Sequence, residues 1–420
     1  FSALTAAPQL MAYDVVVVGL GAYGSAIAYH LARAGAKVLG LDRHAHAAHP
    51  WGSSHGHTRI IRLAYKEGAA YVPLLQRSYQ RFLDLQEACG QPLFKKTGHL
   101  DLGACAVDGD SIASVEKHGL AHEVLTGKEV NKRFPGYGLP DDMPALYQPD
   151  GGLLNPEACV QAHCDGAEQA GAHLRWGQQV VDWKASGRGT SVHLSDGTVV
   201  NSKSLVLSAG PWMADLLPAA KALMVPQRQV VGWFKIQEEH QRTAFRPESF
   251  PVFMMDTTPS AGAGAPGLPD SMPLGGWYGF PDVGSQRGFK IGKYQHLNEV
   301  CHPDSIDRKL HDSGADEEAL RSAVRAFFPL ADGPMLAWST CMFTNTPDGH
   351  FIVDWHPSHP QRVMVCSACS GHGFKMSTGI GELISREMLK PEGDAEATAE
   401  LLLHRIHADR EGHAAWLAAR

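Results

Sequence analysis

A glycine-rich turn between a run of valines and an alanine-rich helix constrains this chain more than any other feature. The segment 14–42 reads DVVVVGLGAYGSAIAYHLARAGAKVLGLD. Its four consecutive valines are typical of a strand buried on both faces. Gly19, Gly21 and Gly24 follow in the spacing GxGxxG and lead into a helix that should end at Gly35. The segment therefore predicts a strand–turn–helix–strand unit that binds a dinucleotide.

Each glycine of this turn has its own physical role. Gly19 allows a tight turn, Gly21 lets the backbone approach a pyrophosphate, and Gly24 lets the helix pack closely on the strand. The free N–H groups at the helix N-terminus attract the same pyrophosphate. Asp42 follows a second strand at 37–41, where a carboxylate can accept hydrogen bonds from ribose hydroxyls. Because all these signals agree, a glycine-rich turn without a nucleotide is the weaker interpretation.

Composition narrows the class of protein. The 420 residues suggest two to three domain-sized units, and the net charge of −7 argues against nucleic acid as a partner. Since no apolar run is long enough to cross a bilayer, we expect no membrane span and a cytoplasmic protein. Residues 1–10 lack a positively charged segment and precede Met11, so we interpret them as a leader or an expression remnant. Eight scattered cysteines do not suggest a disulfide framework.

Strand patterns indicate two kinds of sheet. A buried strand at 205–207 returns to parallel-sheet character, so the nucleotide-binding domain should be discontinuous. Short aromatic runs such as VVGWFKI, GWYGF and GFKIGKY predict an antiparallel sheet. The expected fold class is α/β plus α+β, with a Rossmann-like domain and an antiparallel-sheet substrate domain. The boundaries that we predict are 11–90, 146–222 and 319–395 for the first domain, 91–145 and 223–318 for the second, and 396–420 for a C-terminal helical tail.

Histidines and arginines crowd the stretch after Asp42. The histidines do not match the spacing of a standard zinc site, so we predict no metal. Arg59 and Arg62 are separated by two isoleucines, and on a helical turn they would share one face. Two guanidiniums there would suit a flavin ring or a carboxylate, and solvated surface arginines are the alternative.

Several stretches along the chain carry a family resemblance. In order they are GLGAYG, SHGHTRIIR, YVPLLQRS, VNKRFPG, RQVVGWF, YGFP, FKIG, CMFTNTPDGHFIVD and SGHGFKMSTG. From Tyr13 to about Leu389 the chain resembles the family of monomeric sarcosine oxidase and N-methyltryptophan oxidase, within the D-amino acid oxidase-like FAD amine oxidases. The resemblance implies oxidation of a secondary amino acid, sarcosine or another N-methyl amino acid, at its C–N bond. It also implies FAD as the cofactor and reduction of O2 to H2O2.

The resemblance also implies roles for single residues. Cys341 of the CMFT motif would be joined covalently to FAD. Arg62 and Lys375 match the cations that bind the substrate carboxylate, and Arg59 matches an arginine against the flavin ring. Lys290 matches the lysine that promotes the reaction of reduced flavin with oxygen, where a fixed positive charge stabilises developing superoxide.

Other site residues follow from the same motifs. Tyr278 and His55 match positions that contact substrate or flavin. The family's KLGYH is KIGKYQH here, so its active-site histidine is represented by His296, by Tyr294, or by neither. The long loop 256–272 also departs from the family and puts the substrate's side chain in doubt. The cofactor contacts that we predict are Gly19, Gly21, Ala22, Gly24, Asp42, Arg43, Ser53, Arg59, Val180, Ala209, Gly210, Trp212, Cys341, Gly371, Gly373 and Lys375.

Four other functions stay open at this point. A cyclic imino acid such as pipecolate or proline presents the same carboxylate and secondary amine. A dehydrogenase could pass electrons to an acceptor other than oxygen, and a silent flavin-binding protein or an NAD-linked dehydrogenase is less consistent with the motifs. Cys366 and Cys369 form a CxxC that is either a redox pair or part of a plain strand. The expected partners are an amino acid and O2, and a monomer is expected.

Overall fold

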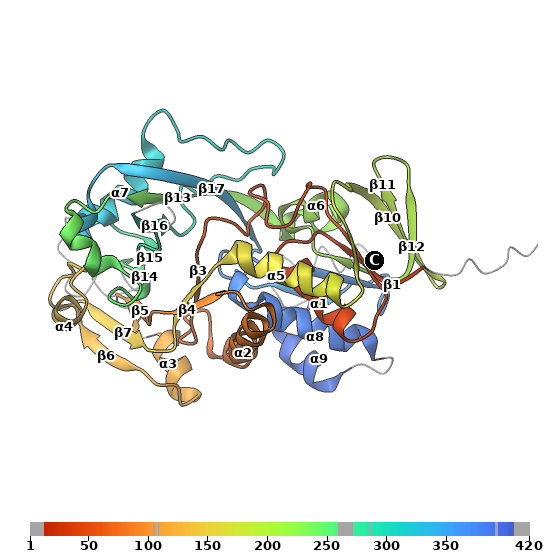
Figure 1. Cartoon of the computed structure of the whole chain (residues 1–420), viewed down its shortest axis with the longest axis horizontal. Coiled ribbons are helices and arrows are strands. Elements are labelled where there is room, and N and C mark those ends of the chain that lie inside the picture. The colour runs from red at the N-terminus through yellow and green to blue at the C-terminus, as the bar shows by residue number, and fades with distance from the viewer. Residues whose placement is uncertain are drawn as a thin grey trace, which may run out of the picture.

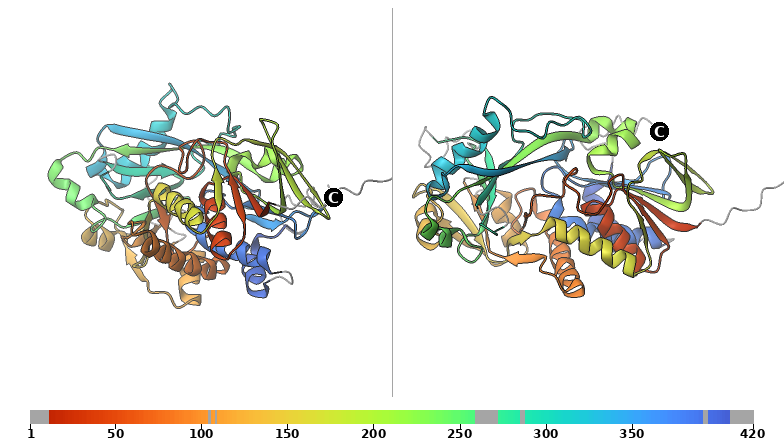
Figure 2. Two further views of the ribbon diagram at one scale, coloured as in Figure 1. Left: turned by 45° about the vertical axis from the view of Figure 1, so that its right-hand side comes forward. Right: turned by 45° about the horizontal axis from the view of Figure 1, so that its top comes forward.

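The computed structural model describes residues 12–103, 106–107, 109–258, 272–284, 288–390 and 394–406. Two large sheets lie at opposite ends of the long axis of these residues, in all three views (Figures 1 and 2). The predicted leader, nearly all of the 256–272 loop and the tail beyond residue 406 lie outside the described residues.

The first large sheet contains the predicted dinucleotide unit. Its strands follow the order β10-β11-β12-β1-β2-β9, and β19 also pairs with β12 and carries β18. Strands β9, β2, β1, β12 and β19 run parallel, whereas β10, β11 and β18 pair antiparallel. The bounds are β1 Tyr13–Val18, β2 Val38–Leu41, β9 His173–Arg175, β10 Val180–Ser186, β11 Gly189–Leu194, β12 Val199–Leu207, β18 Ile352–Trp355 and β19 Val363–Ser367.

Helices cover one face of this sheet. The helix of the dinucleotide unit packs closely between two others, because a Cβ at Gly166 would meet Tyr29 at 2.6 Å and one at Gly381 would meet Ala26 at 2.9 Å. Asn155 caps the N-terminus of the helix α5, which begins at Pro156, because its side chain accepts a hydrogen bond from the Ala158 N–H. The helices are α1 Ala22–Arg33, α2 Val72–Cys89, α5 Pro156–Gln169, α8 Ser377–Leu389 and α9 Ala395–Leu401.

The second large sheet is mostly antiparallel, as predicted. Its order is β17-β13-β16-β15-β14-β5-β7-β6, and β14 and β5 form its parallel pair. Phenylalanines and the helix α7 form a core against it. The strand bounds are β5 His99–Leu102, β6 Glu123–Thr126, β7 Pro144–Gln148, β13 Val225–Phe234, β14 Val252–Asp256, β15 Gly276–Phe280, β16 Phe289–Lys293 and β17 Met335–Asn345. The remaining helices are α3 Asp110–Lys117, α4 Gly127–Arg133, α6 Met213–Leu216 and α7 Ala315–Phe327.

A small antiparallel sheet occupies the place where a helical turn was predicted for Arg59 and Arg62. It has the order β3-β8-β4, with bounds β3 Arg59–Ile61, β8 Gly152–Leu154 and β4 Phe94–Lys96. Arg59 therefore begins a strand, and Arg62 follows the end of the same strand, so the expectation of a helical turn was wrong. The β-branched pair Ile60 and Ile61 pairs with Leu153 and Gly152 of β8, which favours the extended conformation.

The arrangement of the strands positions the site. The carboxyl ends of β1, β2, β12 and β19 lie together at one edge of the first sheet, the usual place for a ligand in an open α/β sheet. Both sheets draw strands from segments that are distant in the sequence. Where one domain ends and the other begins stays a prediction.

Candidate functional site

A cavity of about 380 Å³ runs from the glycine-rich turn to the second sheet. Its wall combines the turn after β1, the segment 52–62, the loop after β12, strand β17 and the segment 366–375. Nearly all of the predicted site residues line it. They are Gly19, Gly21, Ala22, Asp42, Arg43, Ser53, His55, Arg59, Arg62, Val180, Ala209, Gly210, Trp212, Tyr278, Cys341, Gly371, Gly373 and Lys375.

The glycine turn has the geometry that a pyrophosphate needs. Gly19 has φ +86°, and a Cβ there would lie 2.6 Å from the Ser208 carbonyl oxygen. A Cβ at Gly24 would lie 1.7 Å from the Gly19 oxygen, so Gly24 lets the helix approach the turn but does not itself line the cavity. A Cβ at Gly21 would meet no described atom within 4 Å. The open side of Gly21 therefore fits a group bound close to the backbone.

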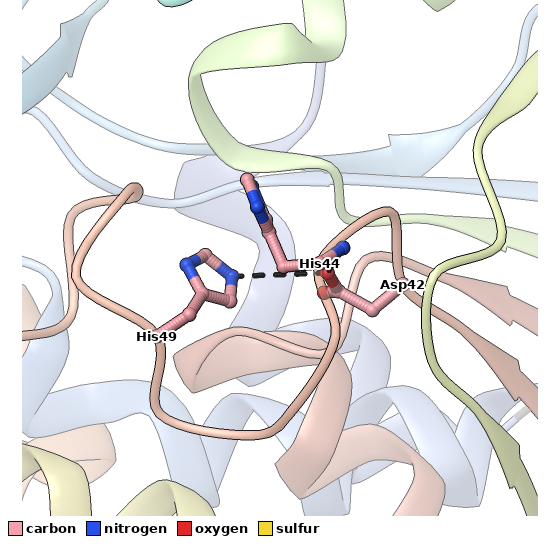
Figure 3. Close-up of side chains that lie close together, drawn as sticks. All are labelled: Asp42, His44 and His49. Atoms are coloured by element: carbon pink, nitrogen blue, oxygen red, sulfur yellow. Dashed lines mark hydrogen bonds and ion pairs between the residues drawn. The ribbon is translucent and has the colours of Figure 1, made fainter.

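Asp42 and two histidines form the end of the cavity beyond this turn (Figure 3). Asp42 accepts hydrogen bonds from the Leu20 and His44 N–H groups at 2.8 and 2.9 Å. His49 Nε2 lies 3.7 Å from Asp42 Oδ1, and the rings of His44 and His49 are 3.9 Å apart. Burial lowers the pKa of both histidines to about 4, so both rings are neutral at pH 7.

The sequence spacing did not predict that these three side chains would meet. One ligand atom from each lies within 4.8 Å of the others, which is close enough to consider a metal. However, Asp42 already accepts two backbone hydrogen bonds, and all three residues line the cavity where a ribose is expected. His44 Nε2 and Ser53 Oγ are buried without a hydrogen-bond partner among the described residues. These polar atoms fit the ribose and phosphate groups of a dinucleotide such as FAD.

A segment that sequence reasoning missed closes over this end. Asp304 Oδ1 lies 3.0 Å from Arg43 Nη1 and accepts a hydrogen bond from Trp212 Nε1 at 2.7 Å. The Arg43 guanidinium lies 5.0 Å from the centre of the Trp212 ring. Arg308 further along the same segment donates to the backbone oxygens of Pro50, Trp51 and Thr340. No local motif marked Asp304, because its partners are far away in the sequence.

The opposite end of the cavity contains two buried cations. Arg62 is 1% exposed, and Lys375 is 5% exposed. Both lie over the ring of Tyr65, with Arg62 Cζ at 4.4 Å and Lys375 Nζ at 5.3 Å from its centre. Burial and the nearby Arg62 lower the pKa of Lys375 to about 7. Lys375 Nζ donates to the His372 carbonyl oxygen at 2.5 Å, and two positive charges therefore face one small volume.

Glu67 is the site residue that sequence reasoning missed at this end. Its Oε2 lies 2.8 Å from Arg62 Nη2, and Glu67 lines the cavity. Burial alone would raise the pKa of Glu67, but Arg62, His372, Lys66 and Lys375 together hold it far below its ordinary value. Glu67 is therefore a carboxylate that offsets one of the two positive charges. Its spacing of five residues from Arg62 was the available signal in the sequence.

Tyr294 and His296, the two candidates for the family's active-site histidine position, lie in different surroundings. Tyr294 lines the cavity, and its hydroxyl donates to the Ser370 carbonyl oxygen at 2.9 Å. His296 is a described residue that does not line the cavity, and its Nε2 lies 2.7 Å from Asp316 Oδ1. Asp316 in turn forms an ion pair with Arg228. This buried contact holds the His296 ring away from the cavity, so a role beside the substrate for His296 stays a prediction that the cavity lining does not support.

His55 and Tyr278 face the cavity from the two sides. Tyr278 lies in β15, and burial raises its pKa, so it is a neutral phenol. His55 Nδ1 lies 3.2 Å from Ser339 Oγ, and its Nε2 has no partner among the described residues. Burial and the neighbouring Arg59 lower the pKa of His55 to about 3. His55 is therefore a neutral ring that keeps one nitrogen for a hydrogen bond to a ligand.

Arg59 and Lys290 both bind oxygens of the segment 53–58. Arg59 lines the cavity and donates to the Thr58 and Ser53 carbonyl oxygens at 2.9 and 2.7 Å. Lys290, in β16, is 2% exposed and is not among the residues that line the cavity. A Cβ at Gly56 would lie 3.7 Å from Lys290 Nζ and 3.8 Å from Arg59 Nη1. The ammonium of Lys290 is therefore directly behind the cavity wall.

Cys341 lies in β17 and is 5% exposed. Burial raises the pKa of its thiol, whereas the positive charges of Arg59 and Lys290 act in the opposite direction. Cys366 and Cys369 also line the cavity, and both are free thiols. The Thr344 N–H donates to Cys369 Sγ at 3.4 Å. The CxxC is therefore not a disulfide in this structure.

Comparisons with known proteins agree with this geometry. The family model described as FAD dependent oxidoreductase matches residues 14–387. The monomeric sarcosine oxidase of Streptomyces avermitilis is 36% identical over 89% of this chain and 92% of its own length. The N-methyl-L-tryptophan oxidase of Yersinia pestis is 31% identical over 89% of this chain and 94% of its own length.

A solved structure supports the fold. The open form of NikD, an unusual amino acid oxidase essential for nikkomycin biosynthesis, matches with a TM-score of 0.75. The match covers 93% of this chain and 97% of NikD at 24% identity, so the likeness concerns the fold. Among the described residues, we find no helix with the length and apolar character of a membrane span.

Proposed function

The chain belongs to the family of FAD-dependent oxidoreductases and is a sarcosine oxidase-like amine oxidase, and from this premise we propose a reaction. The substrate is a secondary amino acid, sarcosine or another N-methyl amino acid, and the bond oxidised is C–N. The imine product hydrolyses in water. For an N-methyl amino acid the final products are the demethylated amino acid and formaldehyde, with H2O2 from O2.

The observation that carries this proposal is the pair of buried cations at the end of the cavity opposite the glycine turn. Arg62 and Lys375 lie over one tyrosine ring, and charges that are buried this deeply need an anionic partner. Glu67 offsets one of the two positive charges. The remaining charge suits a ligand with a single carboxylate, such as an amino acid.

The opposite end of the cavity suits FAD. Gly19 and Gly21 would present the N-terminus of α1 to the pyrophosphate, and Asp42 would accept hydrogen bonds from the ribose. Arg59 would lie against the isoalloxazine ring, and Gly371 and Gly373 would approach its pyrimidine end, where negative charge gathers on reduction. When bound, FAD supplies the capacity to take two electrons and a proton from the substrate and to pass the electrons to O2.

The charges of the site also favour the reactive form of the amine. Arg62, Lys375 and Arg59 together disfavour a further positive charge, so they lower the pKa of a bound ammonium. The substrate's nitrogen then keeps its lone pair free. Lys290 stabilises the negative charge that develops on O2 when it receives its first electron. Tyr278, Tyr294 and the neutral His55 face the substrate without adding charge.

Cys341 is the residue that we propose as a covalent anchor for the flavin. Its thiol lines the cavity; burial raises the pKa of the thiol, and Arg59 and Lys290 offset part of that rise. Formation of a thioether to the flavin's methyl group removes one hydrogen from the thiol and one from the methyl group, and O2 takes up this pair as H2O2.

An absorption spectrum before and after acid precipitation tests the cofactor. Flavin bands that stay with the pellet, and that move to the supernatant in a Cys341→Ser variant, are the expected result. A yellow supernatant from the unchanged protein would contradict the covalent link. A protein that is colourless and takes up no FAD would contradict the whole proposal.

A panel of substrates under anaerobic mixing tests the reaction. We expect N-methyl amino acids to bleach the flavin and to release formaldehyde when O2 is admitted. Bleaching by pipecolate or proline without formaldehyde would indicate a cyclic imino acid instead. A flavin that is reduced by substrate but reacts slowly with O2 would indicate a dehydrogenase.

A further inference from the structure

Three oxygens of the segment 56–58 bind the Nζ of Lys290. Its Nζ donates to Gly56 O at 2.6 Å, to Thr58 Oγ1 at 2.9 Å and to Thr58 O at 3.2 Å. The rings of its cross-strand neighbours Trp233 and Phe280 lie 5.2 and 4.6 Å away. A charged ammonium has three N–H donors for these three oxygens, whereas a neutral amine has two and would need the Thr58 hydroxyl to donate to its nitrogen.

The Gly56 carbonyl that binds Lys290 is part of a peptide group that Glu157 binds from its other end. The C=O of Gly56 and the N–H of His57 belong to one peptide unit, and His57 N donates to Glu157 at 3.1 and 3.2 Å. Gly56 N also donates to Glu157 Oε1 at 2.6 Å. A carboxylate on the N–H side polarises the peptide and places more negative charge on its carbonyl oxygen.

Several charged or titratable groups face Lys290. Burial and Arg59 hold the pKa of Lys290 well below its ordinary value, and Glu157 and Cys341 act in the opposite direction. His55 also faces it and is neutral, because burial lowers the pKa of that ring to about 3. Cys341 is itself a buried thiol whose pKa is raised by burial, so it is largely neutral. Glu157, in the first turn of α5, is therefore the group in this set that supplies a negative charge.

We propose that Glu157 is a positioning residue for the oxygen half of the reaction, which keeps the Lys290 ammonium charged and fixed behind Arg59 through the Gly56–His57 peptide. The inference rests on the proposed function, in which Lys290 stabilises charge on O2. Reduced flavin gives two electrons to O2, two protons follow, and H2O2 leaves. Glu157 is not among the residues that line the cavity, and it exchanges no electron or proton in this step.

The test separates the two half-reactions in the flavin-containing protein. Glu157→Gln keeps the size and one acceptor oxygen but removes the charge. The flavin is reduced by light with an external donor, without substrate, and is then mixed with O2 between about pH 6 and pH 9. We expect reoxidation to be about tenfold slower at the alkaline end and its pH midpoint to be about one unit lower, with recovery at the acidic end.

Three comparisons distinguish positioning from general damage. Anaerobic reduction by substrate should change less than about twofold in Glu157→Gln, since Glu157 does not act on that step. Glu157→Asp keeps the charge and should keep the pH midpoint. Glu168→Gln changes an exposed glutamate near the other end of α5 and should leave both half-reactions unchanged.

A second readout does not use catalysis. In protein labelled with ¹³C at lysine Cε, the Lys290 signal is assigned by its absence in Lys290→Met and is then titrated. Its pKa should fall by about one unit in Glu157→Gln. An unchanged titration, an unchanged midpoint of reoxidation, or an equal loss in both half-reactions would each overturn the inference. If no secondary amine reduces the wild-type flavin while the predicted shifts appear, the proposed function fails and this inference stands.

Discussion

The two ends of the cavity are lined by different kinds of groups. At the dinucleotide end, the backbone forms the wall: Gly19, Gly21 and the N-terminus of α1 leave space and free N–H groups for a ligand. At the other end, buried charged side chains face each other: Arg62 and Glu67 lie five residues apart, and Lys375 comes from a segment far away in the chain. Ligand binding at the first end depends on the shape of the backbone, and ligand binding at the second end depends on the balance of charge. The two ends should therefore fail in different ways when they are altered.

The largest effect should come from removing space at the dinucleotide end. In Gly24→Val, Cβ would lie 1.7 Å from the Gly19 oxygen and 2.7 Å from Ser208 Oγ, so the turn and α1 have to separate. We expect a loss of more than about 4 kcal/mol in the free energy of unfolding and almost no bound flavin. Thermal unfolding and the ratio of flavin to protein absorbance measure both quantities.

Two further glycine variants sharpen this prediction. In Gly21→Ala the new Cβ would meet no described atom within 4 Å, so we expect normal folding and weaker flavin binding. Gly187→Ala, in a turn where a Cβ would also meet no described atom, should change neither quantity. If Gly24→Val retained its flavin, flavin binding at this end would not depend on the close packing of α1 on the turn.

A loss of charge at the other end should reduce catalysis and leave the fold intact. In Lys375→Met one of the two cations that hold the carboxylate is removed, and we expect kcat/KM to fall about 100-fold. Flavin content should stay the same, apart from any contribution of Lys375 to the cofactor contacts that we predicted. Lys128→Met, at an exposed position of α4, is the control. A fall of less than tenfold would show that Arg62 alone holds the carboxylate.

The same balance of charge predicts a pH dependence. Burial and Arg62 lower the pKa of Lys375 to about 7, so the free protein loses this positive charge as the pH rises through 7. A simple carboxylate without an amine, such as butyrate, should bind with a Kd that rises about tenfold per pH unit above this value. Perturbation of the flavin spectrum measures the Kd. The dependence should disappear in Lys375→Met, and the same slope in that variant would assign the titration to another group.

The contrast between the two ends also explains what the sequence could predict. Gly19, Gly21, Gly24 and Asp42 lie within one short segment, and each acts through local backbone geometry, so the pattern was sufficient. The parallel and antiparallel sheets followed from strand patterns for the same reason. At the charged end, the family resemblance supplied residue types and positions, but whether these side chains meet depends on pairing between distant strands.

Arg59, His296 and Glu67 show which features of the site depended on contacts that a sequence pattern does not contain. Arg59 begins a strand because Ile60 and Ile61 pair with β8, which lies more than ninety residues later in the chain. His296 lies away from the cavity because Asp316, at the start of α7, binds its ring, whereas Tyr294 lines the cavity. Glu67 was missed because a lone glutamate after a lysine is ordinary in sequence. Its function depends on burial beside Arg62, which the spacing alone does not show.

The smallest effect should come from the ion pair that closes the dinucleotide end from outside. Asp304 contacts Arg43 and Trp212, but the side chains of Asp304 and Arg43 are 47% and 28% exposed, so water and salt screen their attraction. Asp304→Asn should therefore cost less than about 1 kcal/mol, which is less than about a fivefold rise in the Kd for FAD in a Cys341→Ser background. Titration of the flavin-free variant with FAD at low and high salt measures this cost. The difference in Kd between the protein with Asp304 and the Asp304→Asn variant should shrink at high salt. A loss of tenfold or more that does not depend on salt would mean that Asp304 acts by ordering the segment around it, and the dinucleotide end would then depend on side-chain contacts as much as on its backbone.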